Sequence, residues 1–208
     1  MDRSDNVFAS NFEADSVVAF DGSGRPILEI TDKIDQPYGL AFDREGFLYV
    51  ANFGSSEITR YDSSGVFDRA FTLAEGKFPV GLTITADNRL YVSNPDRDEI
   101  NEYDLTGTYV RTLTESLRTP TGLATDSKGN VYAANRGGDS VSMFDTAGRY
   151  DPGFAPAGLR GPYGVAIGVP EPSAYVLAVV SGLTALVVVR SGRSRSGRPG
   201  SGKPGTCR

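Results

Sequence analysis

The chain has 208 residues, of which 21 are basic and 26 acidic, and it contains no histidine and one cysteine. Six of the basic residues follow residue 189 and all acidic residues occur by Glu171, so the chain before the basic tail carries a net charge of −11. This charge argues against nucleic-acid binding, which depends on Lys and Arg facing phosphate. The absence of histidine excludes imidazole as a catalytic base or metal ligand, and the single Cys207 excludes an intrachain disulfide.

Residues 6–168 contain four repeats of 41 or 42 residues, and three short blocks recur in each of them. The first block ends in asparagine and occupies residues 6–11, 47–52, 89–94 and 130–135. The second block starts six residues after this asparagine, ends in aspartate, and occupies residues 17–21, 58–62, 100–104 and 141–145. The third block opens with Pro-x-Gly and occupies residues 37–42, 79–84, 120–125 and 162–167. This recurrence indicates one structural unit repeated along the chain.

Every block is predicted to form a β-strand, because it is short, rich in β-branched and aromatic residues, and bounded by turn residues. The second block leads into a turn with Asp first and Gly fourth; the Asp side chain caps such a turn and Gly adopts its positive φ. A fourth, weaker strand is predicted after each of these turns, at residues 26–30, 69–72, 109–113 and 153–154. Four strands per repeat, joined by tight turns, are typical of one blade of a β-propeller, so we expect an all-β fold.

The repeat resembles those of NHL-repeat β-propellers, because residues 37–65 match their pattern Pro-x-Gly-Leu-Ala-x-Asp-x-x-Gly-x-Leu-Tyr-Val-Ala-Asn, followed by a strand that ends in Asp-x-x-Gly. The resemblance covers residues 6–168 and leaves residues 1–5 as an N-terminal tail. The chain opens at the second strand of a blade, and its last strand, residues 163–167, is a first strand. Two arrangements therefore remain open: a closed ring of four blades, and an incomplete arc of a larger propeller.

One glycine per repeat is expected at the most crowded part of this fold. Each of these glycines follows Pro-x at the start of the innermost strand, where the blades of a propeller converge, and they are Gly39, Gly81, Gly122 and Gly164. A larger residue there is expected to destabilise the fold, through lost backbone freedom and overpacking.

The C-terminal part has a different composition. Residues 169–173, Val-Pro-Glu-Pro-Ser, act as a linker before 16 uncharged residues, 174–189, and a basic, disordered tail, 190–208. This order resembles the PEP-CTERM sorting signal of bacterial envelope proteins, with the motif residues Pro170, Glu171 and Pro172. The resemblance implies that an exosortase, a membrane protease, acts near the motif.

Residues 174–189 are predicted to form a short transmembrane helix, and arginines on its C-terminal side alone predict a cytoplasmic tail. The propeller would then lie outside the cytoplasm, in the periplasm or at the cell surface. No apolar export segment follows Met1. Either the gene start is placed too late, which we favour, or the apolar run itself directs insertion.

A ligand of such a propeller is expected on the face where the loops after the second and fourth strands open near the axis. The asparagine that begins each of the first loops recurs in all four repeats, which is more typical of a turn cap than of a binding residue. The loop residues that differ between repeats form the candidate binding face: Phe53, Asp96, Arg97, Asp98, Arg136 and Asp139. Carboxylates gather here, but their spacing has no metal-loop signature, so we predict neither a metal nor a cofactor.

Without histidine no Ser-His-Asp or Cys-His arrangement can form, and no catalytic residue is predicted. Streptogramin lyases have similar repeats, but the catalytic histidine of that family has no counterpart here. We therefore expect an exported, envelope-anchored binding or structural module rather than an enzyme. Its expected partners are the exosortase, the membrane and an unknown extracellular ligand or protein, but no nucleic acid. The alternative is a propeller-type lyase or lactonase that acts through carboxylates, with or without a metal.

Overall fold

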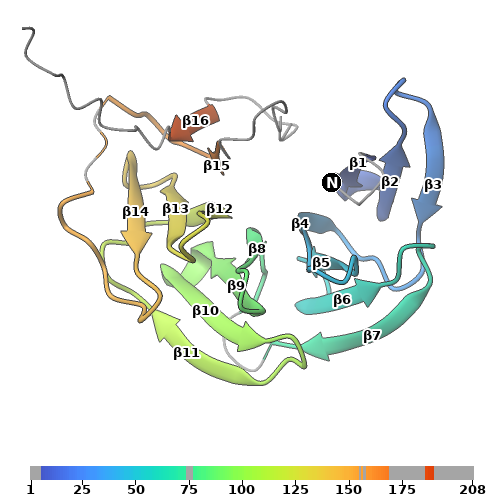
Figure 1. The fold of residues 1–208 in the computed structure, drawn as a ribbon, viewed down its shortest axis with the longest axis horizontal. Helices are drawn as coiled ribbons and strands as arrows, with labels where there is room; N and C mark the ends of the chain where they lie inside the picture. Colours follow the sequence, from blue (N-terminus) through green and yellow to red (C-terminus); the bar gives the residue numbers. More distant parts are fainter. Residues whose placement is uncertain (1–5, 74–76, 155, 157, 169–185, 190–208) are drawn as a thin grey trace, which may run out of the picture.

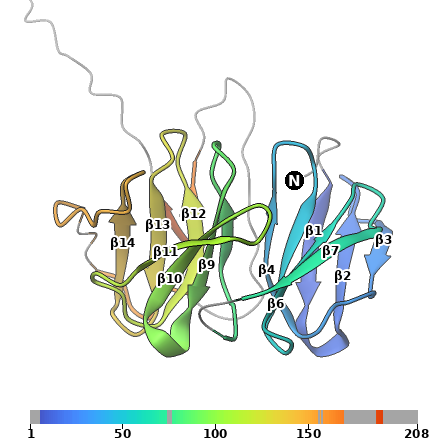
Figure 2. The ribbon, with the colours of Figure 1, turned by 90° about the horizontal axis from the view of Figure 1, so that it is seen from below.

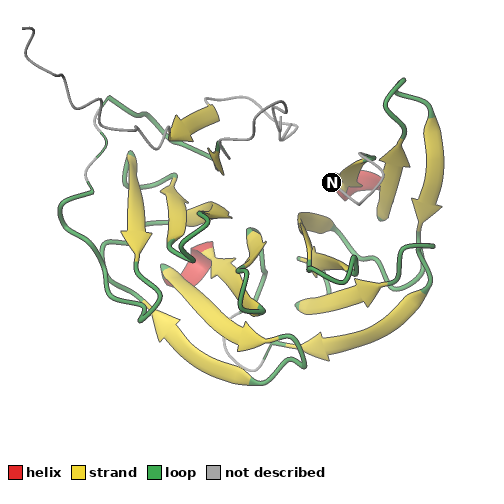
Figure 3. Cartoon of the chain, in the orientation of Figure 1, coloured by secondary structure: helices red, strands yellow, loops and turns green. Residues whose placement is uncertain are grey.

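The computed structural model describes residues 6–73, 77–154, 156, 158–168 and 186–189. Within these residues, four antiparallel β-sheets follow one another around an arc (Figures 1 and 2). Two single turns of 3-10 helix, η1 (Phe12–Ala14) and η2 (Pro95–Arg97), interrupt the loops of the described part (Figure 3). The all-β fold and its repeated sheets are thus confirmed.

Each sheet corresponds to one repeat, and we call it a blade. Blade 1 contains β1 (Val7–Asn11), β2 (Ser16–Phe20) and β3 (Pro26–Ile30). Blade 2 contains β4 (Pro37–Phe42), β5 (Leu48–Asn52), β6 (Glu57–Tyr61) and β7 (Phe67–Thr72). Blade 3 contains β8 (Leu82–Ile84), β9 (Arg89–Asn94), β10 (Glu99–Asp104) and β11 (Tyr109–Leu113). Blade 4 contains β12 (Pro120–Thr125), β13 (Val131–Asn135) and β14 (Ser140–Phe144).

The strands of each blade pair in chain order from the centre of the arc outwards. Figure 1 shows β4, β8 and β12 nearest the centre, and β3, β7 and β11 on the outer side. One further strand, β15 (Gly164–Ile167), continues the inner series beside β12. It pairs in parallel with β16 (Leu186–Val189), while β1 pairs with β2 alone among the described strands. The described strands therefore form an open arc, not a ring closed by pairing of β15 with β1.

The C-terminal predictions fall largely outside the described residues. This holds for the motif at 169–173, for residues 174–185 of the expected helix, for the tail at 190–208 and for residues 1–5. Residues 186–189, the last four of the expected helix, form β16, and the helix as a whole stays a prediction. Three of these four residues are valines, whose branched side chains favour a strand. Across the part of the chain that the structure describes, no helix has both the length and the apolar character needed to cross a membrane.

The predicted fourth strand of blade 4, at residues 153–154, is wrong. The chain makes a single bridge before it, Phe144↔Tyr150, and then forms a turn from which the Phe154 ring packs on Tyr132. Pro152 has no N–H to give to a sheet, and the N–H of Gly153 bonds to the side chain of Asp151 at 2.8 Å, so a turn forms in place of a strand.

The core consists of apolar clusters between neighbouring blades, not of one central cluster. Blades 1 and 2 share a cluster with Val17, Leu48 and Tyr61, and blades 2 and 3 share one with Ile58, Leu90 and Tyr103. A further cluster, with Ile100, Val131 and Phe144, joins blades 3 and 4. Each blade therefore obtains its apolar burial from its neighbours, as expected for stacked repeats.

The repeat glycines lie at the closest approach of these blades. A Cβ on Gly39 would lie 2.6 Å from the carbonyl oxygen of Val80, and one on Gly122 would lie 2.8 Å from the Cα of Gly164. A Cβ on Gly81 would collide with the carbonyl oxygen of Thr121. The predicted crowding is thus confirmed at these three positions: each glycine lets the inner strand of the next blade pack backbone to backbone.

Candidate functional site

In each blade, the loop after the recurring asparagine bonds to the segment that leads into the next blade. These loops are β1–β2, β5–β6, β9–β10 and β13–β14. In each case the last loop residue accepts a hydrogen bond from the backbone N–H that precedes the Pro-x-Gly proline. The bonds to an aspartate Oδ1 come from Gln36 to Asp15 at 2.7 Å, from Thr119 to Asp98 at 2.6 Å, and from Gly161 to Asp139 at 2.6 Å. In blade 2 the acceptor is the Ser56 Oγ, 3.3 Å from the N–H of Phe78.

Both partners in these inter-blade bonds have a left-handed backbone. The φ values are 47° to 59° at the four acceptors and 49° to 57° at Gln36, Phe78 and Thr119, while the fourth donor is Gly161 at 50°. A non-glycine residue in this region costs about 1–2 kcal/mol, so the surrounding contacts must hold it there. Asp98 and Asp139, which were predicted for the binding face, therefore act as links between blades.

The recurring asparagines have the expected role as caps in two blades. Asn52 Oδ1 accepts a hydrogen bond from the N–H of Asp35 at 3.0 Å, and Asn135 Oδ1 accepts one from that of Arg118 at 3.3 Å. Both asparagines are fully buried. These residues fix the loop ends on which any site at this face depends.

The four other candidates lie in the β5–β6, β9–β10 and β13–β14 loops. Asp96 and Arg97 lie exposed in η2, where Arg97 forms an ion pair with Glu99 at 3.0 Å. Phe53 begins the β5–β6 loop, and Arg136 begins the β13–β14 loop. Phe53 and Arg136 each contact further aromatic residues.

Four aromatic rings from three blades pack together around Phe53. Its ring centroid lies 5.6 Å from that of Tyr38 in β4, 6.1 Å from that of Phe12 in η1, and 5.0 Å from that of Phe78. Phe12 and Tyr38 are 4.9 Å apart. Such separations are those of rings in direct contact. Phe78, which precedes blade 3, is 38% exposed, and the other three rings are half-buried.

Tyr163, just before β15, extends this group. Burial raises the pKa of its hydroxyl to about 12, the Tyr38 hydroxyl acts in the same direction, and Arg136 opposes both. The guanidinium carbon of Arg136 lies 5.8 Å from the centroid of the Tyr163 ring, within the range of a cation–π contact. We call the five residues Phe12, Tyr38, Phe53, Phe78 and Tyr163 the aromatic arc.

The repeats contain a sequence signal for this arc. Phe12 and Phe53 both follow the recurring asparagine, and Tyr38 and Tyr163 both occupy the variable position of Pro-x-Gly. Aromatic residues at equivalent places of different repeats are brought to one end of the fold by the repeat itself.

No protein-family model matches the chain, and no curated protein matches it. Among solved structures, virginiamycin B lyase from Staphylococcus aureus with quinupristin is 16% identical with a TM-score of 0.66, over 78% of this chain and 56% of that one. The nidogen/laminin complex gives 20% identity and a TM-score of 0.68, over 78% and 64%. Hydrazine synthase of Kuenenia stuttgartiensis gives 26% identity and a TM-score of 0.61, over 72% and 45%.

The fold is a β-propeller. The similarity to the propellers among these structures, together with the sheets described above, establishes this architecture. At such identities the likeness carries the fold alone. The chain spans between 45% and 64% of the length of the three structures.

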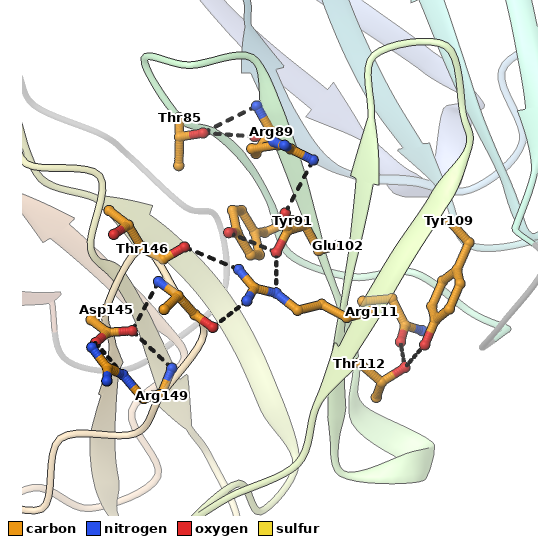
Figure 4. A network of polar contacts seen from close by, with 12 residues as sticks. Thr85, Arg89, Tyr91, Glu102, Tyr109, Arg111, Thr112, Asp145, Thr146 and Arg149 are labelled. Atoms are coloured by element: carbon orange, nitrogen blue, oxygen red, sulfur yellow. Dashed lines mark hydrogen bonds and ion pairs between the residues drawn. The ribbon is translucent and has the colours of Figure 1, made fainter.

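Apart from the aromatic arc, this propeller contains a polar cluster around Glu102 of β10 (Figure 4). The Glu102 residue is 2% exposed. Its carboxylate accepts hydrogen bonds from the Tyr91 hydroxyl at 3.0 Å and from Arg111 Nε at 2.5 Å. Arg111 also donates to the carbonyl oxygens of Thr146 and Ala147 in blade 4. Burial, and then the charge of Glu102, raise the pKa of Tyr91 to about 12. Because its members bond to one another and to blade 4, this cluster joins two blades and does not form a site.

The described part of the propeller also holds no evident metal centre. Within these residues, no three Asp, Glu or Cys side chains lie close enough together to hold a metal ion. The feature best suited to contact another molecule is therefore the aromatic arc.

Proposed function

We propose that this propeller is a binding module and that the aromatic arc contacts its ligand. The observation that carries the proposal is the contact of four rings from blades 1, 2 and 3 at one end of the fold, with Phe78 38% exposed. Aromatic side chains with partly exposed faces contribute much of the energy at binding surfaces.

The geometry also restricts the ligand. Because the rings touch one another, no gap remains for a group to insert between them, and the ligand must lie across the arc. The net charge of −11 before the tail disfavours a polyanion. We therefore propose a neutral or basic ligand with flat apolar faces, such as a sugar chain or a proline-containing peptide.

Two of the similar structures are consistent with a binding role for the architecture. One is a lyase solved with quinupristin, and the other is nidogen in complex with laminin. Propellers of this shape thus accommodate both a small molecule and a protein, and the residues of the arc must decide the ligand here.

Arrays of neutral glycans and of peptides provide the test, with the full-length protein as the probe. Phe78→Ala should weaken binding to the array members found by about tenfold or more, because it removes the most exposed ring of the arc. Tyr109→Ala is the matched control, since this aromatic residue of β11 is 39% exposed on the outer side. Equal losses in the two variants, or no binding to any array member, would contradict the proposal.

We further propose that the binding module is exported and sorted at the bacterial envelope. The proposal rests on the order of Pro170-Glu171-Pro172, the uncharged run and the basic tail. Two prolines oppose both sheet pairing and helix continuation, and this sequence property suits a protease substrate. The propeller would face outwards, and the exosortase and the membrane would be its partners during maturation.

Mass spectrometry of the envelope-extracted protein tests this sorting. In a host with an exosortase, the mature chain should end near residue 172 and lack Cys207. Glu171→Ala should block the loss of the tail, whereas Glu115→Ala in the propeller should not. A mature wild-type chain that still ends in Arg208 in such a host would rule out sorting.

A further inference from the structure

Blade 4 differs from the other blades at its outer edge. In blades 1 to 3 a fourth strand, β3, β7 or β11, pairs along the outer edge of the third strand. In blade 4 the chain makes one bridge, Phe144↔Tyr150, flanked by two backbone bonds: from Asp151 N–H to the Met143 carbonyl and from Asp145 N–H to the Arg149 carbonyl, both at 2.9 Å. The outer edge of β14 from residue 140 to 142 therefore pairs with no described residue.

A cavity of about 280 Å³ lies along this edge. Its apolar wall is formed by Val141, Tyr150 and Phe154, and its polar wall includes Ser140, Ser142 and Arg118. Hydrogen bonds fix the polar wall: the side-chain amide of Asn135 donates to the Ser140 Oγ at 3.2 Å and to the Ser142 Oγ at 2.8 Å. The Ser142 hydroxyl donates to the Ser116 carbonyl at 2.6 Å. The cavity thus has a rigid strand as one side.

The other blades show what occupies the equivalent space. The residue at the position of Val141 faces an apolar residue of the fourth strand in each of them: Val17↔Ile30, Ile58↔Phe71 and Ile100↔Leu113. In blade 2 a second buried apolar residue, Leu73, follows two positions after Phe71. The same molecule therefore supplies a template for an extended segment with apolar residues two positions apart.

We propose that the outer edge of β14 binds an extended segment of another protein, which adds to blade 4 as an antiparallel fourth strand. An apolar residue of the segment faces Val141 and packs against Phe154, which lies on the same face of blade 4 as Val141. Backbone hydrogen bonds to an unpaired sheet edge supply affinity, and the pockets for alternate side chains supply specificity. In an antiparallel strand, the C-terminal end of the segment lies beside the start of β14, where Arg118 lines the cavity, so an acidic residue at that end is favoured.

The chain itself supplies a probe for this site. A fluorescent peptide with the sequence of residues 67–73, which forms β7 against Ile58, is extended at its C-terminus by Glu and amidated. Its anisotropy is titrated with full-length protein, and hydrogen exchange follows the amide of Val141, which points to the outer edge because Met143 two residues later does. We expect saturable binding below about 1 mM and slower exchange at this amide.

Two N-methylated peptides separate strand addition from adhesion of side chains. One is methylated at the Phe that faces Val141 and the other at the following Thr, so only one of them loses a bond to β14. Strand addition predicts a loss of about tenfold or more for one peptide and little for the other. Equal affinities of the two would overturn the proposal, as would no binding at about 1 mM.

Arg118→Glu keeps the proposal testable without a change in the core, because this side chain is exposed. It should weaken the peptide that ends in Glu and strengthen one that ends in Lys. If this preference does not reverse, the proposed orientation of the segment is wrong. If the protein is a dimer by light scattering, the peptide does not dissociate it, and exchange at the Val141 amide is already slow, then the edge pairs with a second copy and the proposed partner is wrong.

Discussion

Strands β1 and β5 hold the same place in successive repeats, yet all five residues of β5 are buried whereas those of β1 are exposed or half-buried. Their sequences are similar, Val-Phe-Ala-Ser-Asn in β1 and Leu-Tyr-Val-Ala-Asn in β5. The difference lies in their neighbours: β5 pairs with both β4 and β6, and β1 pairs with β2 alone among the described strands. Burial in this fold is therefore a property of a blade's position in the arc as well as of its own residues.

The most direct test of this comparison is to truncate the side chain at the equivalent position of the two strands. Leu48, which begins β5, is 1% exposed, and its equivalent Val7 is 43% exposed. We expect Leu48→Ala to lower the free energy of unfolding by about 3 kcal/mol, because it leaves a cavity between blades 1 and 2. Val7→Ala should change it by no more than about 0.5 kcal/mol. Urea unfolding of the two variants measures both values; similar losses would mean that β1 is covered in solution.

Blade contacts at the inner strands can be broken at a single glycine. Gly81→Val should destabilise the protein by about 2 kcal/mol, because its side chain would collide with the backbone at Thr121 in the next blade. Gly22→Val is the matched control, since no atom lies within 4 Å of the added Cβ in the first turn of blade 1. A thermal midpoint of Gly81→Val equal to that of the control would show that the inner strands are not tightly packed.

The fold could be predicted from the sequence where local and repeated signals agree. The strands at residues 26–30 and 109–113 form as predicted, because turn chemistry and β-branched residues favour the same structure. The fourth strand of blade 4 failed because Pro152 and Gly153 favour a turn over the pattern of the other repeats.

The site was harder to predict, for a physical reason. The variable loop residues included Phe53, but its ring partners lie elsewhere in the sequence. Tyr38 belongs to the inner strand β4, and Phe78 belongs to the segment before blade 3. Asp98 and Asp139 were predicted to bind a ligand because the residue at their repeat position varies. In blade 2 this residue is Ser56. Ser and Asp oxygens accept the same backbone bond, so the role is constant while the residue is not.

Buried tyrosines distinguish the blade interfaces from blade 1, whose residues 6–30 contain no tyrosine. Burial raises the pKa of both Tyr61 and Tyr91 to about 12, whereas an unfolded tyrosine titrates near 10. The unfolded chain loses these protons first, so stability is present below pH ~10 and should fall between pH ~10 and ~12, by up to ~1.4 kcal/mol per pH unit for each tyrosine. Urea unfolding across this range measures the slope, and Tyr61→Phe should reduce it; an unchanged slope in that variant would show that Tyr61 does not titrate late.

Asp98 could serve either as a link between blades or as a ligand-binding residue, and substitutions distinguish the two roles. Asp98→Ala should cost about 1 kcal/mol of unfolding free energy, because the N–H of Thr119 loses its acceptor and a left-handed residue loses its support. Asp98→Asn keeps an oxygen acceptor and tolerates the left-handed backbone, so it should stay within about 0.5 kcal/mol of the parent, as should Asp96→Ala in the same loop. Ligand binding, measured on the array members found with the parent protein, supplies the second readout. If Asp98→Ala retains parental stability but loses binding, the carboxylate belongs to the ligand site and not to the link between blades 3 and 4.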